Sequence, residues 1–195
     1  MDIWLASSNK HKQKEVQGFL KDWTVKIPSD AGIDFDPAET GSTFLDNAFI
    51  KARDLYRLLA KPVIADDSGL CVDALNGRPG IYSARYGADN GEKLQDSDRN
   101  ALLLREMEPF SLRSACFVCA MVLIVEKNRF FAVQETLEGE ITKHFCGENG
   151  FGFDPIFYLP QKKCNLAELG LDEKNKLSHR GKALCAVEKV LQSLI

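Results

Sequence analysis

The stretch that most constrains the fold is residues 61–73, KPVIADDSGLCVD, in which a short apolar run leads into two adjacent carboxylates. Residues 63–65 predict a buried strand, and the small residues 68–69 predict a turn before a second apolar segment. Neighbouring carboxylates at the end of a buried strand repel each other, so a fold that keeps both normally supplies a cation or a shared proton. The alternative is a solvated turn in which Asp66 and Asp67 cap backbone groups.

Length and charge narrow the class of protein. The 195 residues are enough for a single domain, 1–195, or for two lobes that share a core. The 28 acidic and 25 basic residues give a net charge of −3 and are spread along the chain, so no basic stripe for a nucleic-acid polymer is present. No apolar run approaches the roughly 20 residues that cross a bilayer, and residues 1–5 do not resemble a signal peptide. We therefore expect a cytoplasmic protein without a membrane partner.

The six cysteines fit a reduced protein better than a disulfide or metal framework. Cys116 and Cys119 have a spacing that occurs in zinc sites, but both lie in the run 115–125, which predicts a strand. Residues three apart on a strand point to opposite faces. A zinc site there is therefore not expected.

The N-terminal region predicts a strand at residues 2–6 followed by a helix that begins after residues 7–9. Unpaired backbone amides and the helix dipole both attract an anion at such a helix start. The alternative is an ordinary cap with solvated basic side chains. The candidate anion-binding residues are Ser7, Ser8, Asn9, Lys10, His11 and Lys12.

Thr43 with Asp46 three residues later resembles a capping box, and apolar residues then recur at helical spacing up to residue 59. Lys51 shares a second face of this helix with Asn47, from which it could reach a ligand over the first two turns. The alternative is a solvated polar face.

The remaining pattern is an alternation of strands and helices. Strands are predicted at 23–27, 115–125 and 130–141, the last two as a hairpin, and helices at 92–107 and 178–195. Together with the resemblance described below, this predicts an α/β fold with a mixed twisted sheet, flanking helices and two lobes around a central cleft.

Residues 147–155, GENGFGFDP, form a glycine-rich segment that fails the dinucleotide-binding fingerprint, because no third glycine opens a helix. Its glycines would allow close approach to a flat ligand, with Phe151 or Phe153 as a stacking surface. The alternative is two core aromatic residues in a tight turn.

A second basic cluster surrounds the start of the last predicted helix. His179, Arg180 and Lys182 crowd the positive end of the helix dipole, and Lys174 lies just upstream. This arrangement is unfavourable unless an electron-rich group lies there, so these residues form a second candidate ligand surface.

Five stretches, taken together, resemble the inosine/xanthosine triphosphate pyrophosphatases, which remove deaminated purine nucleotides. They span nearly the whole chain in the order of that family. They are SSNKHKQKE at 7–15, ETGSTFLDNAFIKA at 39–52, ADDSGLCVDALNGRPGIYSARYG at 65–87, GFGFDPIF at 150–157 and LSHRGKAL at 177–184.

The resemblance implies a homodimeric, Mg²⁺-dependent enzyme that cuts ITP, dITP or XTP between the α- and β-phosphates and releases the monophosphate and pyrophosphate. It assigns the phosphates to residues 7–12 and Lys51, and the proton acceptor to Asp67. It places Glu39, Asp66 and Asp67 around Mg²⁺. The further substrate contacts that it implies are Ser68 and, around the base, Phe151, Gly152, Phe153, Asp154, Lys174, His179 and Arg180.

Lys174 and Arg180 could donate to the 6-keto oxygen of hypoxanthine or xanthine, whereas adenine presents an amino group there. How guanine is excluded does not follow from the sequence. Asp46 stands where this family usually has glutamate, which favours its interpretation as a helix cap. Two alternatives remain open: a pyrophosphatase for other altered nucleotides, such as modified pyrimidines, and a nucleotide-binding protein without catalysis.

Overall fold

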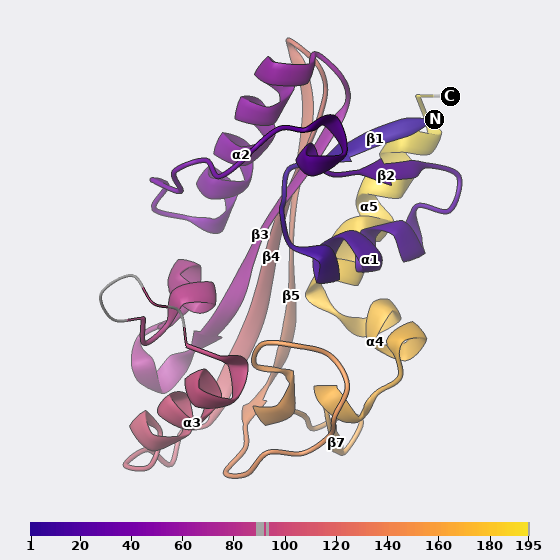
Figure 1. Ribbon diagram of the computed structural model, residues 1–195. Coiled ribbons are helices and arrows are strands. Elements are labelled where there is room, and N and C mark those ends of the chain that lie inside the picture. The colour runs from indigo at the N-terminus through magenta and orange to yellow at the C-terminus, as the bar shows by residue number, and fades with distance from the viewer. Residues whose placement is uncertain (89–91, 93, 195) are drawn as a thin grey trace. The chain divides into compact units, whose positions relative to one another are not determined.

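The computed structural model describes residues 1–88, 92 and 94–194 (Figure 1). Its backbone contacts divide the chain into two compact units, each assembled from separate segments. The first unit is Met1–Asp67, Cys119–Glu135 and Arg180–Ile195, and the second is Ser68–Val118 and Thr136–His179. Three of the boundaries fall within the long strands β3 (Val63–Val72), β4 (Ser114–Glu126) and β5 (Arg129–Ile141), and the fourth falls at the start of helix α5 (His179–Gln192).

Among the described residues, seven strands form one sheet in the order β2-β1-β3-β4-β5-β6-β7. The four strands other than β3, β4 and β5 are β1 (Asp2–Leu5), β2 (Thr24–Lys26), β6 (Phe157–Leu159) and β7 (Cys164–Asn165). Strand β1 is parallel to both of its neighbours, β2 and β3, whereas β6 is antiparallel to β5 and β7. The sheet is therefore mixed, which confirms the α/β class expected from the sequence.

The first unit contains the N- and C-terminal helices and the parallel strands. Val16 of the first helix and Leu20, which directly follows that helix, pack with Ala183 and Val187 of the last helix in one apolar cluster with β1. The elements are β1 (Asp2–Leu5), α1 (Lys10–Phe19), β2 (Thr24–Lys26), η1 (Pro28–Ala31), α2 (Phe44–Leu59) and α5 (His179–Gln192), whose first residue belongs to the second unit. The predicted strands at 2–6 and 23–27 and the helices after residues 9 and 43 are confirmed.

The second unit has a core of its own around Leu70, Met107, Phe117 and Phe157. Its helices and strands, with the strands that both units share, are β3 (Val63–Val72), η2 (Asp73–Leu75), η3 (Gly80–Arg85), α3 (Asp96–Glu106), β4 (Ser114–Glu126), β5 (Arg129–Ile141), η4 (Asp154–Ile156), β6 (Phe157–Leu159), β7 (Cys164–Asn165), η5 (Leu166–Glu168) and α4 (Leu171–Leu177).

Several boundaries differ from those expected. The hairpin of β4 and β5 is confirmed, since two adjacent strands joined by residues 127–128 must run antiparallel. Helix α3 begins at Asp96 rather than near residue 92, and residue 93 of the predicted helix lies outside the described residues. The short helix α4 was not expected from the sequence.

The turn predicted at residues 68–69 is wrong, because β3 continues without interruption from Val63 to Val72. The reason is that side chains alternate between the two faces of a strand with a period of two residues. Ile64 belongs to the core of the first unit, and Leu70 and Val72 belong to the core of the second, so the even-numbered positions keep apolar burial on both sides of Ser68. Asp66 and Asp67 therefore lie inside a strand, on opposite faces of the sheet.

No helix of the described part of the chain is long and apolar enough to cross a membrane.

The start of α2 gives a first test. The Thr43 hydroxyl accepts the Asp46 amide at 3.1 Å, and the Asp46 carboxylate accepts the Thr43 amide at 3.1 Å, which confirms the capping box. We expect Thr43→Ala to lower the free energy of unfolding by about 1 kcal/mol, because one amide of the first turn loses its acceptor. Thr43→Ser should restore it to within a few tenths. Equal urea midpoints for all three proteins would contradict the assignment.

Candidate functional site

The start of α1 has the geometry of a capped helix. The Asn9 Oδ1 atom accepts the amides of His11 at 2.9 Å and Lys12 at 3.3 Å, and the Ser7 hydroxyl accepts the Asn9 amide at 3.1 Å. Asn9 thus satisfies two first-turn amides that an anion would otherwise use. Ser8 and Lys10 are exposed. The cap is confirmed, and anion binding at residues 7–12 stays a prediction.

One face of β3 carries a buried ionic cluster centred on Asp66. Its Oδ2 atom lies 3.0 Å from Lys12 Nζ, 3.2 Å from Arg180 Nη2 and 3.3 Å from Arg180 Nε. Arg180 Nη1 donates to Glu15 Oε2 at 2.7 Å. Asp66, Glu15 and Arg180 are all buried, so two carboxylates and two cations neutralise each other away from water.

These contacts decide the charge state of Asp66. Burial raises the pKa of its carboxyl, but the charges of Lys12 and Arg180 outweigh burial and hold that pKa well below its usual range. Burial likewise lowers the pKa of Arg180, and Asp66 and Glu15 more than reverse this. Cys119 on the neighbouring strand is a neutral thiol, since burial and the charge of Asp66 raise its pKa to about 12.

The opposite face of β3 carries Asp67, which meets helix α2. Lys51 Nζ donates to Asp67 Oδ1 at 2.7 Å and to Glu39 Oε1 at 2.9 Å. Asn47 Nδ2, one turn earlier on α2, lies 3.4 Å from Asp67 Oδ2. The structure thus brings the predicted residues Glu39, Lys51 and Asp67 together, with two carboxylates on one ammonium group.

Asp67 has the opposite electrostatic character to Asp66. Burial raises the pKa of its carboxyl, and with the negative charge of Glu39 it outweighs the opposing charge of Lys51. Burial lowers the pKa of Lys51, but Asp67, Asp66 and Glu39 together raise it, so the lysine remains a cation. Two carboxyls whose pKa values are shifted in opposite directions are suited to different roles. The one with the raised pKa is the better proton acceptor.

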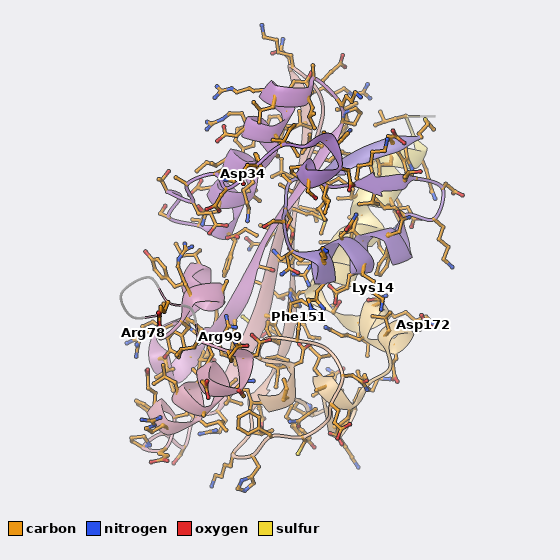
Figure 2. All side chains as sticks on the ribbon, viewed as in Figure 1. Lys14, Asp34, Arg78, Arg99, Phe151 and Asp172 are labelled. Carbon is orange, nitrogen blue, oxygen red and sulfur yellow. The ribbon has the colours of Figure 1, made fainter. Side chains whose placement is uncertain are left out.

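The second unit holds the glycine-rich loop. Asp154 Oδ2 accepts the Phe151 amide at 2.9 Å and Lys174 Nζ at 2.8 Å, and Lys174 Nζ lies 4.7 Å from the centroid of the Phe151 ring. Asp154 and Lys174 are buried, whereas Phe151, labelled in Figure 2, is half-buried. These three predicted residues therefore form one cluster.

Two other predicted residues of this unit are packed into its core. Phe153 is buried against Tyr86, with ring centroids 6.4 Å apart, which leaves Phe151 as the better candidate for stacking. The His179 ring stacks on Phe117 at 4.8 Å and nearly parallel, at 7°. Ser68 is half-buried on β3, and alternation places it on the face opposite to Asp67.

The predicted site residues thus form two sets, one in each unit. Arg180, which the resemblance grouped with the base contacts, belongs to the first unit and pairs with Asp66 and Glu15. Glu15 was missed from the sequence. A signal existed, because residues 12, 15, 16 and 19 fall on one face of α1 and two of them are charged.

The fold and these clusters define an α/β protein that pairs carboxylates with buried cations on both faces of a central strand. The chain belongs to the Ham1 family, whose model matches residues 3–190. Among curated proteins it is 50% identical over 192 residues to the dITP/XTP pyrophosphatase of Treponema denticola, covering 98% of this chain and 99% of that protein. It is 42% identical over 193 residues to the dITP/XTP pyrophosphatase of Thermoanaerobacter pseudethanolicus, covering 98% and 96%.

Solved structures agree with this assignment. A HAM1 protein from Coxiella burnetii is similar with a TM-score of 0.90 and 40% identity, covering 99% of both chains. The Ham1 protein of Staphylococcus aureus is similar with a TM-score of 0.89 and 39% identity, covering 100% of both chains.

The contrast between the two aspartates predicts that their substitution affects stability to different extents. At pH 7, Asp66→Asn should lower the free energy of unfolding by about 3–5 kcal/mol, since Lys12 and Arg180 lose their shared counter-charge. Asp67→Asn should change it by no more than about 1 kcal/mol, because Lys51 keeps Glu39 and a costly buried charge is removed. Urea unfolding of both variants measures the difference. Similar losses for the two would contradict it.

The ion pairs of Asp66 with Lys12 and Arg180 predict how the free energy of unfolding depends on pH. The folded-state pKa of Asp66 lies below the unfolded value of about 3.9, so its stabilisation is present above about pH 4 and is lost as the pH falls below that value. The stability gap between the wild type and Asp66→Asn should therefore stay constant from pH 7 to about 5 and narrow below about 4. A gap that grows on acidification would refute the ion-pair account.

Proposed function

We propose that this protein hydrolyses deaminated purine nucleoside triphosphates, namely ITP, dITP and XTP, to the monophosphate and pyrophosphate. Full-length relatives up to 50% identical carry the name dITP/XTP pyrophosphatase. The structural observation that carries the proposal is Asp67, a buried carboxylate with a raised pKa, beside Glu39 and Lys51. This is the composition expected of a site that activates water next to polyanionic phosphates.

We infer that Mg²⁺ is the cofactor and that Glu39 and Asp67 are its protein ligands. The donor set fits, because both carboxylates already converge on one positive charge, the Lys51 ammonium. Mg²⁺ typically uses one or two carboxylates together with substrate phosphates and water. Within the described residues, no three His, Cys, Asp or Glu side chains are grouped to hold a metal alone. Asp66 was predicted as a third ligand, but it faces the other way, toward Lys12 and Arg180.

The bound metal would supply charge neutralisation on the phosphates and would orient them. Asp67 accepts the proton of the attacking water as the oxygen of that water bonds to the α-phosphorus. The bond between the α- and β-phosphates breaks, and the electron pair leaves with pyrophosphate. Lys51 holds Asp67 in place and adds a positive charge next to it.

Base recognition is assigned to the second unit. The Lys174 ammonium donates to Asp154 and lies beside the Phe151 ring, and in this proposal it also donates to the 6-keto oxygen of hypoxanthine or xanthine. Adenine presents an amino donor at that position, and the buried lysine would lose an acceptor. Phe151 offers the stacking face. Arg180, predicted from the resemblance as a base contact, is assigned to hold Asp66 instead.

The homodimer remains a prediction from the resemblance, and the cytoplasmic location remains a prediction from the sequence pattern. Light scattering on the purified protein tests the first of them, and a monomer mass would refute it.

A substrate panel tests the proposed function. Purified protein with Mg²⁺ should release pyrophosphate from ITP, dITP and XTP with kcat/KM at least about 100-fold above that for ATP, since an unpaired buried donor costs about 1–3 kcal/mol and misplacement costs more. Preference for a modified pyrimidine triphosphate would favour the alternative substrate class. Tight ITP binding without turnover would favour a non-catalytic role.

The role of Asp67 has its own test. Asp67→Asn should lower kcat for ITP by about 10²- to 10⁴-fold, because the water loses its proton acceptor, while ITP binding in calorimetry changes little. Asn47→Ala is a matched control, since it removes a contact to the same carboxylate and leaves the acceptor itself. Turnover retained in Asp67→Asn would refute the assignment.

A further inference from the structure

The glycine-rich loop of the second unit is attached to helix α3 through both peptide groups of one residue. The Gly152 N–H donates to Asp96 Oδ2 at 2.6 Å, and the Gly152 carbonyl accepts Asn100 Nδ2 at 2.9 Å. Asp96 and Asn100 are four residues apart on α3, so their side chains project from the same face of the helix. These two hydrogen bonds, from Asp96 and Asn100 to the backbone of Gly152, are together called the α3 clamp.

That point controls the directions of the two phenylalanines. Gly152 has a φ of 64°, in the left-handed region that glycine adopts without strain, and it separates Phe151 from Phe153. Its N–H belongs to the peptide plane shared with Phe151, and its carbonyl belongs to the plane shared with Phe153. Holding both planes directs Phe153 into the core and leaves Phe151 half-buried beside Lys174.

Asp96, the residue of α3 that accepts the Gly152 N–H, is itself held by an ion pair. Arg99, labelled with Phe151 in Figure 2, pairs with Asp96 and donates to the carbonyls of Ser83 at 3.1 Å and Ala84 at 2.7 Å. Its guanidinium lies 5.8 Å from the centroid of the Phe153 ring. The clamp is therefore part of a network that ties α3, the loop and residues 83–84 together.

Asn100 has the burial of a functional polar residue rather than of a solvated helix face. Only 1% of it is exposed, and it projects from the middle of a helix whose other fully buried side chain is Leu103. A buried amide costs free energy unless it is hydrogen-bonded, and the Nδ2 atom of Asn100 donates to the Gly152 carbonyl. Its role is thus directed at the loop.

We propose that Asp96 and Asn100 are positioning residues for base discrimination, which set the Phe151 ring and the Lys174–Asp154 pair in the orientation that selects a 6-keto purine. This inference rests on the proposed function and adds two residues that touch the loop and not the base. Within the loop, Asp154 still accepts the Phe151 amide at 2.9 Å, and it also accepts Lys174 of α4 at 2.8 Å. Losing the α3 clamp therefore leaves the loop attached but free to rotate about residue 152.

The test compares Asp96→Ala and Asn100→Leu with two matched controls. Asp96→Asn keeps an oxygen that accepts the Gly152 N–H and should rescue the loss. Ser97→Ala changes an exposed side chain on the same helix and should have no effect. For the two clamp variants we expect KM for ITP to rise about tenfold and kcat to change less than about twofold, because each loses one hydrogen bond and the proton acceptor is untouched.

The decisive readout is the ratio of kcat/KM for ITP to that for ATP, which should fall about tenfold in both clamp variants. Partial unfolding cannot produce this result, since it lowers the rates with both substrates in the same proportion. A wild-type ratio in Asp96→Ala and Asn100→Leu would overturn the inference, even if either variant were less stable.

Hydrogen exchange separates failure of this inference from failure of the proposed function. The amides of residues 151–154 should exchange faster in Asp96→Ala and Asn100→Leu than in the wild type, and at the wild-type rate in Ser97→Ala. If the wild type does not cleave ITP, the proposed function fails, and unchanged loop exchange in Asp96→Ala would then overturn the clamp as well. Faster loop exchange with an unchanged substrate ratio would overturn the role in discrimination.

Discussion

The alternation of side chains along β3 is the constraint on which the rest of the structure depends. Neighbouring residues of a strand point to opposite faces, so Asp66 and Asp67 do not share one environment. Each carboxylate then needs its own cations, which α1 and α5 supply on one face and α2 on the other. Segments far apart in the sequence are held against a single strand by two adjacent acids.

The two aspartates consequently acquire different chemistry from identical side chains. Asp66 is enclosed by two cations and stays ionised, so it stabilises the fold and fixes the start of α5. Asp67 shares Lys51 with Glu39, and burial raises its pKa, so it suits proton transfer. The proposed hydrolysis uses one carboxylate for reaction and the other to hold the cations of the site in place.

In the second unit the corresponding constraint is on the backbone. The loop around Gly152 has little regular structure of its own, and its peptide groups are held by side chains of α3 and by Asp154. Hydrogen bonds of this kind order a loop without burying it completely, and Phe151 keeps part of its surface available. A rigid helix can therefore set the geometry of a recognition loop that it supports from outside the proposed contacts.

Local patterns in the sequence alone determined the capping box at Thr43, a helix cap within residues 7–9 and the long hairpin, because each depends on residues close together in the chain. The α/β class followed from the alternation of strands and helices together with the family resemblance. The five family stretches also identified Glu39, Lys51 and Asp67, which the fold brings together. The continuity of β3 through Ser68, the burial of Phe153, the partners of Arg180 and the clamp of Asp96 and Asn100 were decided only by tertiary structure. Each depends on a contact with a strand, helix or loop distant in sequence, and residue type and spacing do not specify which partner a buried polar group will find.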